Sequence, residues 1–136
     1  MATVGSAIQR PLAVMMSRRI LSVGPDAPVI EAARTMQEAK VGALLVSEGA
    51  RFIGIVSETD LVRRVLAVGG DVHQVRVSDV MRSPIITIES DRSAHEASDL
   101  MAERGIRHLA VADGGKIVGM LSVRDLLRYF KNWGGL

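Results

Sequence analysis

Two short segments of the chain carry residue types that could bind a nucleotide. Both read glycine, two apolar residues, serine, two variable residues and aspartate, and they span 54–60 and 119–125. The pattern is typical of a strand that ends where a helix begins, with the serine at the helix N-cap. The free N–H groups and the dipole of a helix start favour an anion. A carboxylate one turn later suits two vicinal hydroxyls, so the pair indicates a site for phosphate and a diol.

The same residues also have a purely structural interpretation. A serine followed three residues later by an acid is a common helix start, in which the two side chains cap the first turn. Both interpretations remain open at this point. The occurrence of the motif twice, with glycine at the same offset each time, weakens the purely structural one.

The segments that position these motifs form an internal repeat. A shift of 65 residues aligns the chain on itself without a gap from Met16 to Arg63, and it places Asp60 on Asp125. A unit of this length is too long for a typical solenoid repeat, so we expect two similar lobes packed face to face. Each lobe alone would bury little core, which favours their pairing.

Each copy predicts the order strand, helix, strand, strand, helix. The alternation of apolar residues, the helical spacing and the Gly-containing turns place these elements. In chain order we expect strands at 20–23 and 85–88, helices starting after Asp26 and Ser90-Asp91, strand pairs at 41–47 with 52–56 and 106–112 with 117–121, and closing helices from Ser57 and Ser122. Met36 and Met101 are expected to fill the core.

The composition excludes several classes of protein. The chain has 136 residues, of which 48% are hydrophobic and 24% charged, as in a globular protein. The absence of cysteine excludes disulfides, thiolate zinc sites and cysteine catalysis, and it is consistent with a cytoplasmic location. No apolar run approaches the ~20 residues that span a bilayer, and the first residues do not resemble a signal peptide. We therefore expect no membrane partner.

The sequence predicts neither a catalytic residue nor a metal site. No serine-histidine-acid constellation or phosphate-loop lysine motif is found, so we expect no enzyme activity. His95 and Asp99 have a helical spacing that could suit a metal, but without a third ligand we interpret them as a solvated helix face. The basic pair Arg63-Arg64 is likewise interpreted as a solvated face rather than a nucleic-acid patch.

The duplicated unit, with its closing motif, resembles a tandem pair of cystathionine-β-synthase (CBS) domains, a Bateman module. The segments 79–81 and 107–111 also resemble the family's start and second strand, and the likeness covers about 15–130. It implies an α/β (α+β) fold of two strand-helix-strand-strand-helix repeats packed about a pseudo-two-fold axis. The implied domains are 12–67 and 78–132, joined by a linker at 68–77.

The resemblance implies a regulatory sensor of an adenosine ligand, with up to two clefts between the lobes. The ligand would be AMP, ADP, ATP or S-adenosylmethionine, and no catalytic cofactor is implied. By position, the resemblance implies that Asp60 and Asp125 bind the ribose hydroxyls. It implies that the phosphate is bound by Ser57 and Ser122, with contributions from Thr59 and Arg124. The residues next to the adenine would be Ser22, Val23, Thr87 and Ile88, and the rest of the cleft would be lined by Gly42, Ala43, Arg107 and His108.

The two copies differ in charge at these positions. The second offers Arg107, His108 and Arg124 as phosphate donors, whereas the first offers Gly42 and Ala43. We therefore expect the cleft that carries Asp125 to bind anionic nucleotides more tightly. We also expect a homodimer packed through helices, acting on a regulated protein that the sequence does not identify. The alternatives are a nucleic-acid-binding protein and a purely structural or oligomerisation module without ligand.

Overall fold

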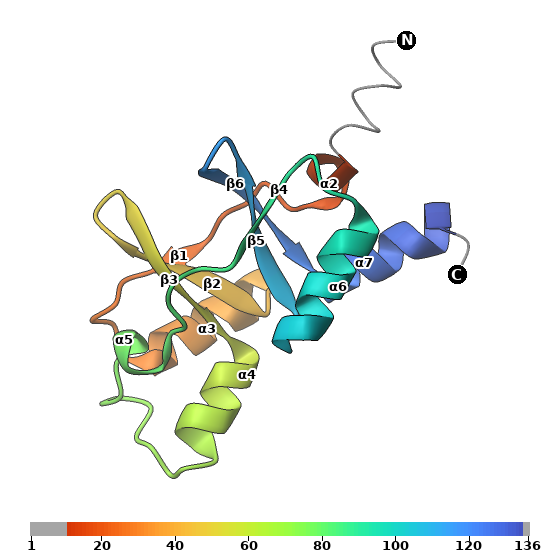
Figure 1. Ribbon diagram of the computed structural model, residues 1–136. Helices are drawn as coiled ribbons and strands as arrows, with labels where there is room; N and C mark the ends of the chain where they lie inside the picture. The colour runs from red at the N-terminus through yellow and green to blue at the C-terminus, as the bar shows by residue number, and fades with distance from the viewer. Residues whose placement is uncertain (1–10, 135–136) are drawn as a thin grey trace. The chain divides into compact units, whose positions relative to one another are not determined.

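The computed structural model describes residues 11–134, which divide into two compact units (Figure 1). The first-repeat unit comprises Leu21–Ile85. Among the described residues, the second-repeat unit comprises residues 11–20 together with residues 86–134. Residues 12–20, which are the start of the first copy in sequence, thus belong to the unit of the second copy. Each unit is described by itself.

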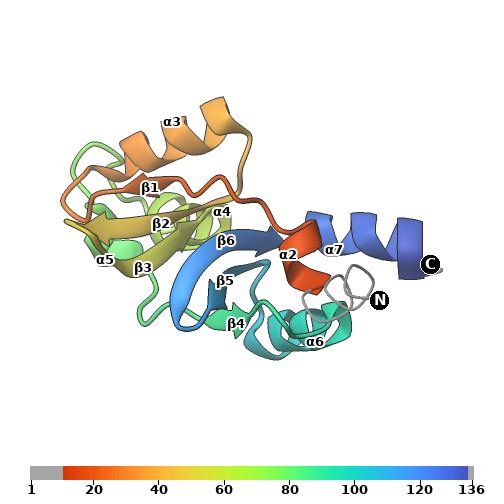
Figure 2. The same cartoon turned by 90° about the horizontal axis from the view of Figure 1, so that it is seen from above.

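The first-repeat unit is a three-stranded sheet with helices. Its strands are β1 (Ser22–Val23), β2 (Ala43–Glu48) and β3 (Arg51–Ser57), in the order β1-β2-β3. Strand β1 is parallel to β2, and β3 is antiparallel to it. The helices are α3 (Val29–Ala39), α4 (Glu58–Leu61), which continues into the π-helical turn η1 (Val62–Leu66), and α5 (Val77–Val80). Helix α3 runs beside the sheet (Figures 1 and 2).

The second-repeat unit has the same plan. Its strands are β4 (Thr87–Glu89), β5 (His108–Asp113) and β6 (Lys116–Ser122), in the order β4-β5-β6. Its helices are α2 (Pro11–Met15), α6 (Ala94–Arg104) and α7 (Val123–Tyr129), the last of which continues into η2 (Phe130–Gly134). The predicted order of strand, helix, strand, strand, helix is therefore confirmed in both copies. None of the helices within residues 11–134 has the length and apolar content that crossing a bilayer requires.

The strand pairs close through Gly-containing turns at the predicted places, and each turn has two residues between the last paired positions. Glu48 pairs with Arg51, and Asp113 pairs with Lys116. Gly114 has φ +62°, which a side chain would strain, so glycine suits this turn. The equivalent hairpins share a register irregularity, after Val46 and after Val111. The duplication therefore preserves backbone detail as well as element order.

Each unit has its own cluster of buried aliphatic side chains. The prediction that two methionines fill the core is confirmed, since Met36 of α3 and Met101 of α6 are members of the buried clusters. The buried members are Val29, Ala32, Met36, Leu44, Val46, Val56, Val65, Val77 and Val80 in one cluster, and Leu12, Met16, Ile88, Ala94, Ala97, Met101, Leu109, Val111, Leu121 and Leu126 in the other. Burial of apolar surface in these clusters is the main stabilising contribution.

The expected start of the first helix is wrong. Helix α3 begins after Pro28, and the carbonyls of Val75 and Val72 accept hydrogen bonds from the N–H groups of Val29 and Ile30, at 2.9 and 3.1 Å. Asp26 instead forms an exposed ion pair with Arg76 at 3.3 Å. A segment distant in sequence thus satisfies the helix start, which local sequence patterns cannot reveal.

The expected start of the second helix is also wrong by a few residues. Helix α6 is capped by Ser93, whose Oγ accepts a hydrogen bond from the N–H of Glu96 at 3.0 Å. Ser90 is buried, and its N–H donates to the carbonyl of Ala112 at 2.8 Å. Ser90 therefore extends the pairing of β4 with β5, and the capping role passes to the next serine.

Candidate functional site

The glycine of the first closing motif lies where another chain segment crosses strand β3. The N–H of Ile55 donates to the carbonyl of Arg82 at 3.0 Å, and the N–H of Arg82 donates to the carbonyl of Ile55 at 2.8 Å. A Cβ on Gly54 would lie 2.7 Å from Met81 Sδ and 3.0 Å from the Arg82 carbonyl oxygen. Only glycine leaves room for this approach.

The second closing motif is crossed in the same way. Ser17 and Met120 exchange backbone hydrogen bonds of 2.8 and 2.9 Å. A Cβ on Gly119 would lie 2.5 Å from Met16 Sδ and 2.8 Å from the Ser17 carbonyl oxygen. The motif glycines therefore serve the packing of the crossing segments, residues 81–82 and 16–17.

The serine and aspartate of each motif form a capping box. In the first copy, the N–H and Oγ of Ser57 both donate to Asp60 Oδ2, at 2.9 Å each, and Ser57 Oγ accepts from the N–H of Asp60 at 3.3 Å. In the second, Ser122 makes the same bonds with Asp125 at 2.8, 2.9 and 3.1 Å. The structural interpretation of the motif is thus realised in both copies, and it commits one carboxylate oxygen of each aspartate.

The predicted residues of the second strands lie beside these boxes. Ala43 pairs with Ser57 and His108 with Ser122 across the antiparallel strands. The carbonyl of Gly42 accepts from the N–H of Glu58 at 2.9 Å, and that of Arg107 accepts from Val123 at 3.0 Å. The fold therefore brings these residues to the start of each closing helix.

The remaining positions around each capping box differ in exposure. Thr59, in the first turn of α4, is partly buried. The side chains of Arg107 and Arg124 are exposed, one just before β5 and the other in the first turn of α7. Two exposed cationic side chains therefore lie on the backbone segments that flank the second capping box.

The predicted residues of the first strands lie further along each sheet. Ser22 and Val23 pair with Leu45 and Val46, two and three positions beyond Ala43. The hydroxyl of Ser47 donates to Ser22 Oγ at 3.2 Å.

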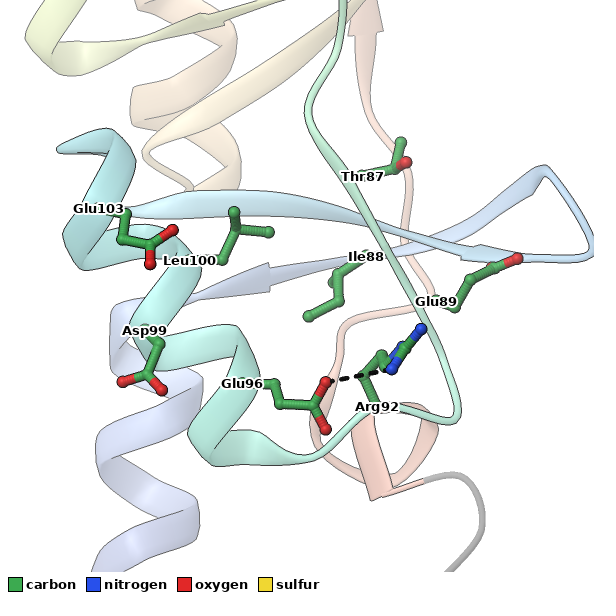
Figure 3. A pocket seen from close by; sticks show the side chains of 8 residues that line it. All are labelled: Thr87, Ile88, Glu89, Arg92, Glu96, Asp99, Leu100 and Glu103. Atoms are coloured by element: carbon green, nitrogen blue, oxygen red, sulfur yellow. Dashed lines mark hydrogen bonds and ion pairs between the residues drawn. The ribbon is translucent and has the colours of Figure 1, made fainter.

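Their counterparts line a separate pocket in the second-repeat unit (Figure 3). Ile88 is buried in the core and Thr87 is exposed. The lining residues are Thr87, Ile88, Glu89, Arg92, Glu96, Asp99, Leu100 and Glu103, which do not include Ser122 or Asp125. Its one guanidinium, on Arg92, is paired with Glu96 at 3.4 Å, so the pocket is unfavourable for phosphate.

The two motif aspartates differ in their second oxygen. Asp60 is 1% exposed, and its Oδ1 accepts from Arg82 Nε at 2.8 Å. Asp125 is partly buried, and no donor among residues 11–134 is within hydrogen-bond distance of its Oδ1.

The position equivalent to Arg82 in the repeat is Ser17, which is exposed and accepts from the N–H of Arg19 at 3.2 Å. Sequence reasoning did not single out Arg82 or Ser17. The repeat register contained the signal, because the shift that aligns Met16 with Met81 also aligns these two residues.

Comparison with known proteins identifies the family of both copies. The family model described as "CBS domain" matches residues 12–67 and 77–132. A protein of Methanopyrus kandleri is 35% identical over 113 residues, which cover 82% of this chain but 58% of the relative. The CBS domain-containing protein YhcV of Bacillus subtilis is 33% identical over 111 residues, covering 82% of this chain and 79% of that protein.

A solved structure has the same architecture. The structure of a CBS-domain protein from Burkholderia ambifaria is 35% identical, with a TM-score of 0.82, and the match covers 86% of each chain. The residues that the CBS-domain family model matches include both crossed strands, both capping boxes and both hairpins. The chain therefore belongs to the CBS-domain family, and it carries two CBS domains in tandem.

Proposed function

We propose that this chain is a regulatory module that binds an adenosine ligand, AMP, ADP, ATP or S-adenosylmethionine, and changes shape or association in response. CBS domains are generally regulatory ligand-binding modules. The observation that carries the proposal for this chain is the state of Asp125. One carboxylate oxygen is held by Ser122, and the other has no donor among residues 11–134.

The geometry around Asp125 suits a ribose. The two bonds from Ser122 orient the carboxylate, so that Oδ1 is held in place as an acceptor for the hydroxyls of a vicinal diol. Hydrogen bonds to an ionised acceptor are shorter and stronger than those between neutral groups. The exposed guanidinium groups of Arg107 and Arg124 supply donors for a phosphate.

The chemistry of the site supports binding rather than catalysis. The Ser122 hydroxyl donates a hydrogen bond to Asp125, so the serine and the carboxylate together form the capping box. Across residues 11–134 no group of three or more His, Asp or Glu side chains could hold a metal ion. A bound ligand would act by favouring one conformation, and only as far as its affinity differs between conformations.

The same proposal includes a homodimer that presents the module to a regulated protein. Val62 and Leu66, in η1, are 54% and 61% exposed, and Leu127, the equivalent of Val62 in α7, is 57% exposed. Exposed apolar side chains on both closing helices support packing of one protein chain on a second, identical chain. Size-exclusion chromatography with light scattering should give twice the chain mass, and a monomer mass at working concentration would contradict the dimer.

The binding proposal is tested by thermal unfolding and calorimetry. AMP, ADP, ATP and S-adenosylmethionine are added separately, and a ligand present at 100 times its Kd should stabilise the protein by about 2.7 kcal/mol. The variant Asp125→Asn keeps an oxygen for Ser122 but replaces the free acceptor by an amide, and it should weaken binding at least about tenfold. Asp99→Asn, an exposed carboxylate of α6, is the matched control.

Two further ligands sharpen this test. The 2′-deoxy form of AMP lacks one hydroxyl of the diol and should bind more weakly than AMP. A short DNA duplex probes the nucleic-acid alternative. Stabilisation by the duplex alone, or equal affinity of Asp125→Asn and the unmodified protein for AMP, would overturn the proposal.

A further inference from the structure

We infer that Arg82 closes the diol-binding carboxylate of the first copy, so that the module has one working nucleotide site, at Asp125. The inference rests on the proposed function, because it concerns which of the two motif aspartates can hold a ribose. It comes from a contact made by a residue outside both closing motifs.

Both oxygens of the Asp60 carboxylate are already engaged by donors of the first-repeat unit. Its Oδ2 accepts the two bonds from Ser57, and its Oδ1 accepts from Arg82 Nε at 2.8 Å. Its side chain is 1% exposed, whereas that of Arg82 is 44% exposed. The guanidinium group therefore covers the carboxylate from the solvent side.

Arg82 is held in this position by its own backbone. Its N–H and carbonyl are both bonded to Ile55, in the middle of β3. A pocket of about 460 Å³ opens beside the ion pair and is lined by Asp60, Arg63, Arg64, Met81, Arg82 and Ser83. A diol entering this pocket meets Arg82 where, at Asp125, it would meet an oxygen that has no donor within residues 11–134.

The second copy has serine in the place of this arginine. Ser17 is bonded to Met120 just as Arg82 is bonded to Ile55, so the two backbones are equivalent. The short Ser17 side chain is engaged with the N–H of Arg19 instead of Asp125. One residue type on the crossing segment thus separates a closed carboxylate from an open one.

Displacement of Arg82 by a ribose would be unfavourable. It would exchange a hydrogen bond between two charged groups for bonds from neutral hydroxyls. It would also leave a charged guanidinium without its partner, next to Arg63 and Arg64. A ligand at Asp60 therefore binds more weakly than the same ligand at Asp125.

Calorimetric titration with AMP tests the inference through stoichiometry. The unmodified protein should bind one AMP per chain, and Asp125→Asn should abolish this site, whereas Asp60→Asn should change its Kd less than about twofold. Arg82→Ser gives the first copy the serine that the second copy has at this position, and it should raise the stoichiometry to two. Ser17→Arg gives the second copy the arginine that the first copy has at this position, and it should abolish AMP binding. Ser17→Gln, with a long uncharged side chain, should retain AMP binding.

The outcomes separate the inference from the proposed function. Two AMP molecules per unmodified chain, one site that depends on Asp60, or a folded Arg82→Ser protein that still binds one AMP would overturn the inference while the proposed function stands. The melting temperature of Arg82→Ser reports whether it is folded, and Ser17→Arg tests the inference independently, because full binding by that variant would overturn it. If AMP does not bind, the same titrations are made with ADP, ATP and S-adenosylmethionine, and absence of binding of all four ligands in every protein would overturn the proposed function and the inference with it.

Discussion

The two closing motifs are locally alike and differ in their surroundings. Their capping boxes agree within 0.2 Å in each bond, from 2.8 to 2.9 Å for the bonds to the carboxylate and from 3.1 to 3.3 Å for the return bond. Yet Asp60 is fully buried and paired with Arg82, whereas Asp125 is partly buried and keeps one oxygen unpaired within the described chain. A duplicated motif thus retains its local structure while a neighbour from elsewhere in the sequence changes what it can bind.

Replacement of each motif aspartate by alanine should give the largest difference in stability loss between the two copies. Asp60→Ala removes a capping acceptor and the partner of Arg82 from a buried position, so we expect a loss of about 2–4 kcal/mol in the free energy of unfolding. Asp125→Ala removes only the cap and should lose about 1 kcal/mol. Chemical denaturation measures both values.

The control for this comparison is the double change Asp60→Ala with Arg82→Ala. Because it removes both members of the pair, it should be less destabilising than the sum of the two single changes. Equal losses for the two single aspartate variants would show that the Arg82 contact contributes nothing to stability.

Replacement of the motif glycines by alanine should have an intermediate effect on the free energy of unfolding. At Gly119 the new Cβ would lie 2.8 Å from the Ser17 carbonyl oxygen, which is itself bonded to Met120, so the crossing segment must shift. We expect a loss of about 1–3 kcal/mol there and a smaller loss at Gly54, where the backbone oxygen is 3.0 Å away. Thermal and urea unfolding measure the order of these effects.

Gly24 provides the matched control for the glycine series. A Cβ at Gly24 would meet no atom within 4 Å, so Gly24→Ala should be close to neutral. If Gly54→Ala and Gly119→Ala were equally neutral, the crossing segments would be too loosely held to explain the motif glycines.

Removal of the capping hydroxyls should give the smallest difference between the copies. Ser57→Ala and Ser122→Ala each lose the same cap, for which we expect about 1 kcal/mol in both. Unfolding in urea compares the two variants directly. A much larger loss for Ser57→Ala would place part of the difference between the copies in the capping box itself rather than in Arg82.

The sequence predicted the repeated architecture because its signals are local and occur twice. The alternating apolar residues, the Gly-containing turns and the helical spacing of Val29, Ala32 and Met36 each specify an element from a few neighbouring residues. The helix starts were less predictable. Asp26 has the residue type of a cap, but carbonyls from residues 72 and 75 satisfy the helix instead.

The candidate site was predicted only in part. The serine and aspartate of each motif could be found from their spacing, and so could the strand residues that lie beside them. In the sequence, the two copies differ in charge at Arg107, His108 and Arg124. The structure adds a second difference, at Arg82 and Ser17. Arg82 lies 22 residues after Asp60, and Ser17 lies far before Asp125 in the sequence.

By itself, the sequence determined that this chain is a tandem repeat with a helix-capping serine and aspartate closing each copy. It could do so because strand alternation, helix periodicity and capping depend on residues close together in the chain. Only the tertiary structure decided that residues 81–82 cross β3 and residues 16–17 cross β6. These contacts join distant segments, so two features follow from how the chain is folded: the burial of Asp60 beside Arg82, and an oxygen of Asp125 that has no donor in the described part of the chain.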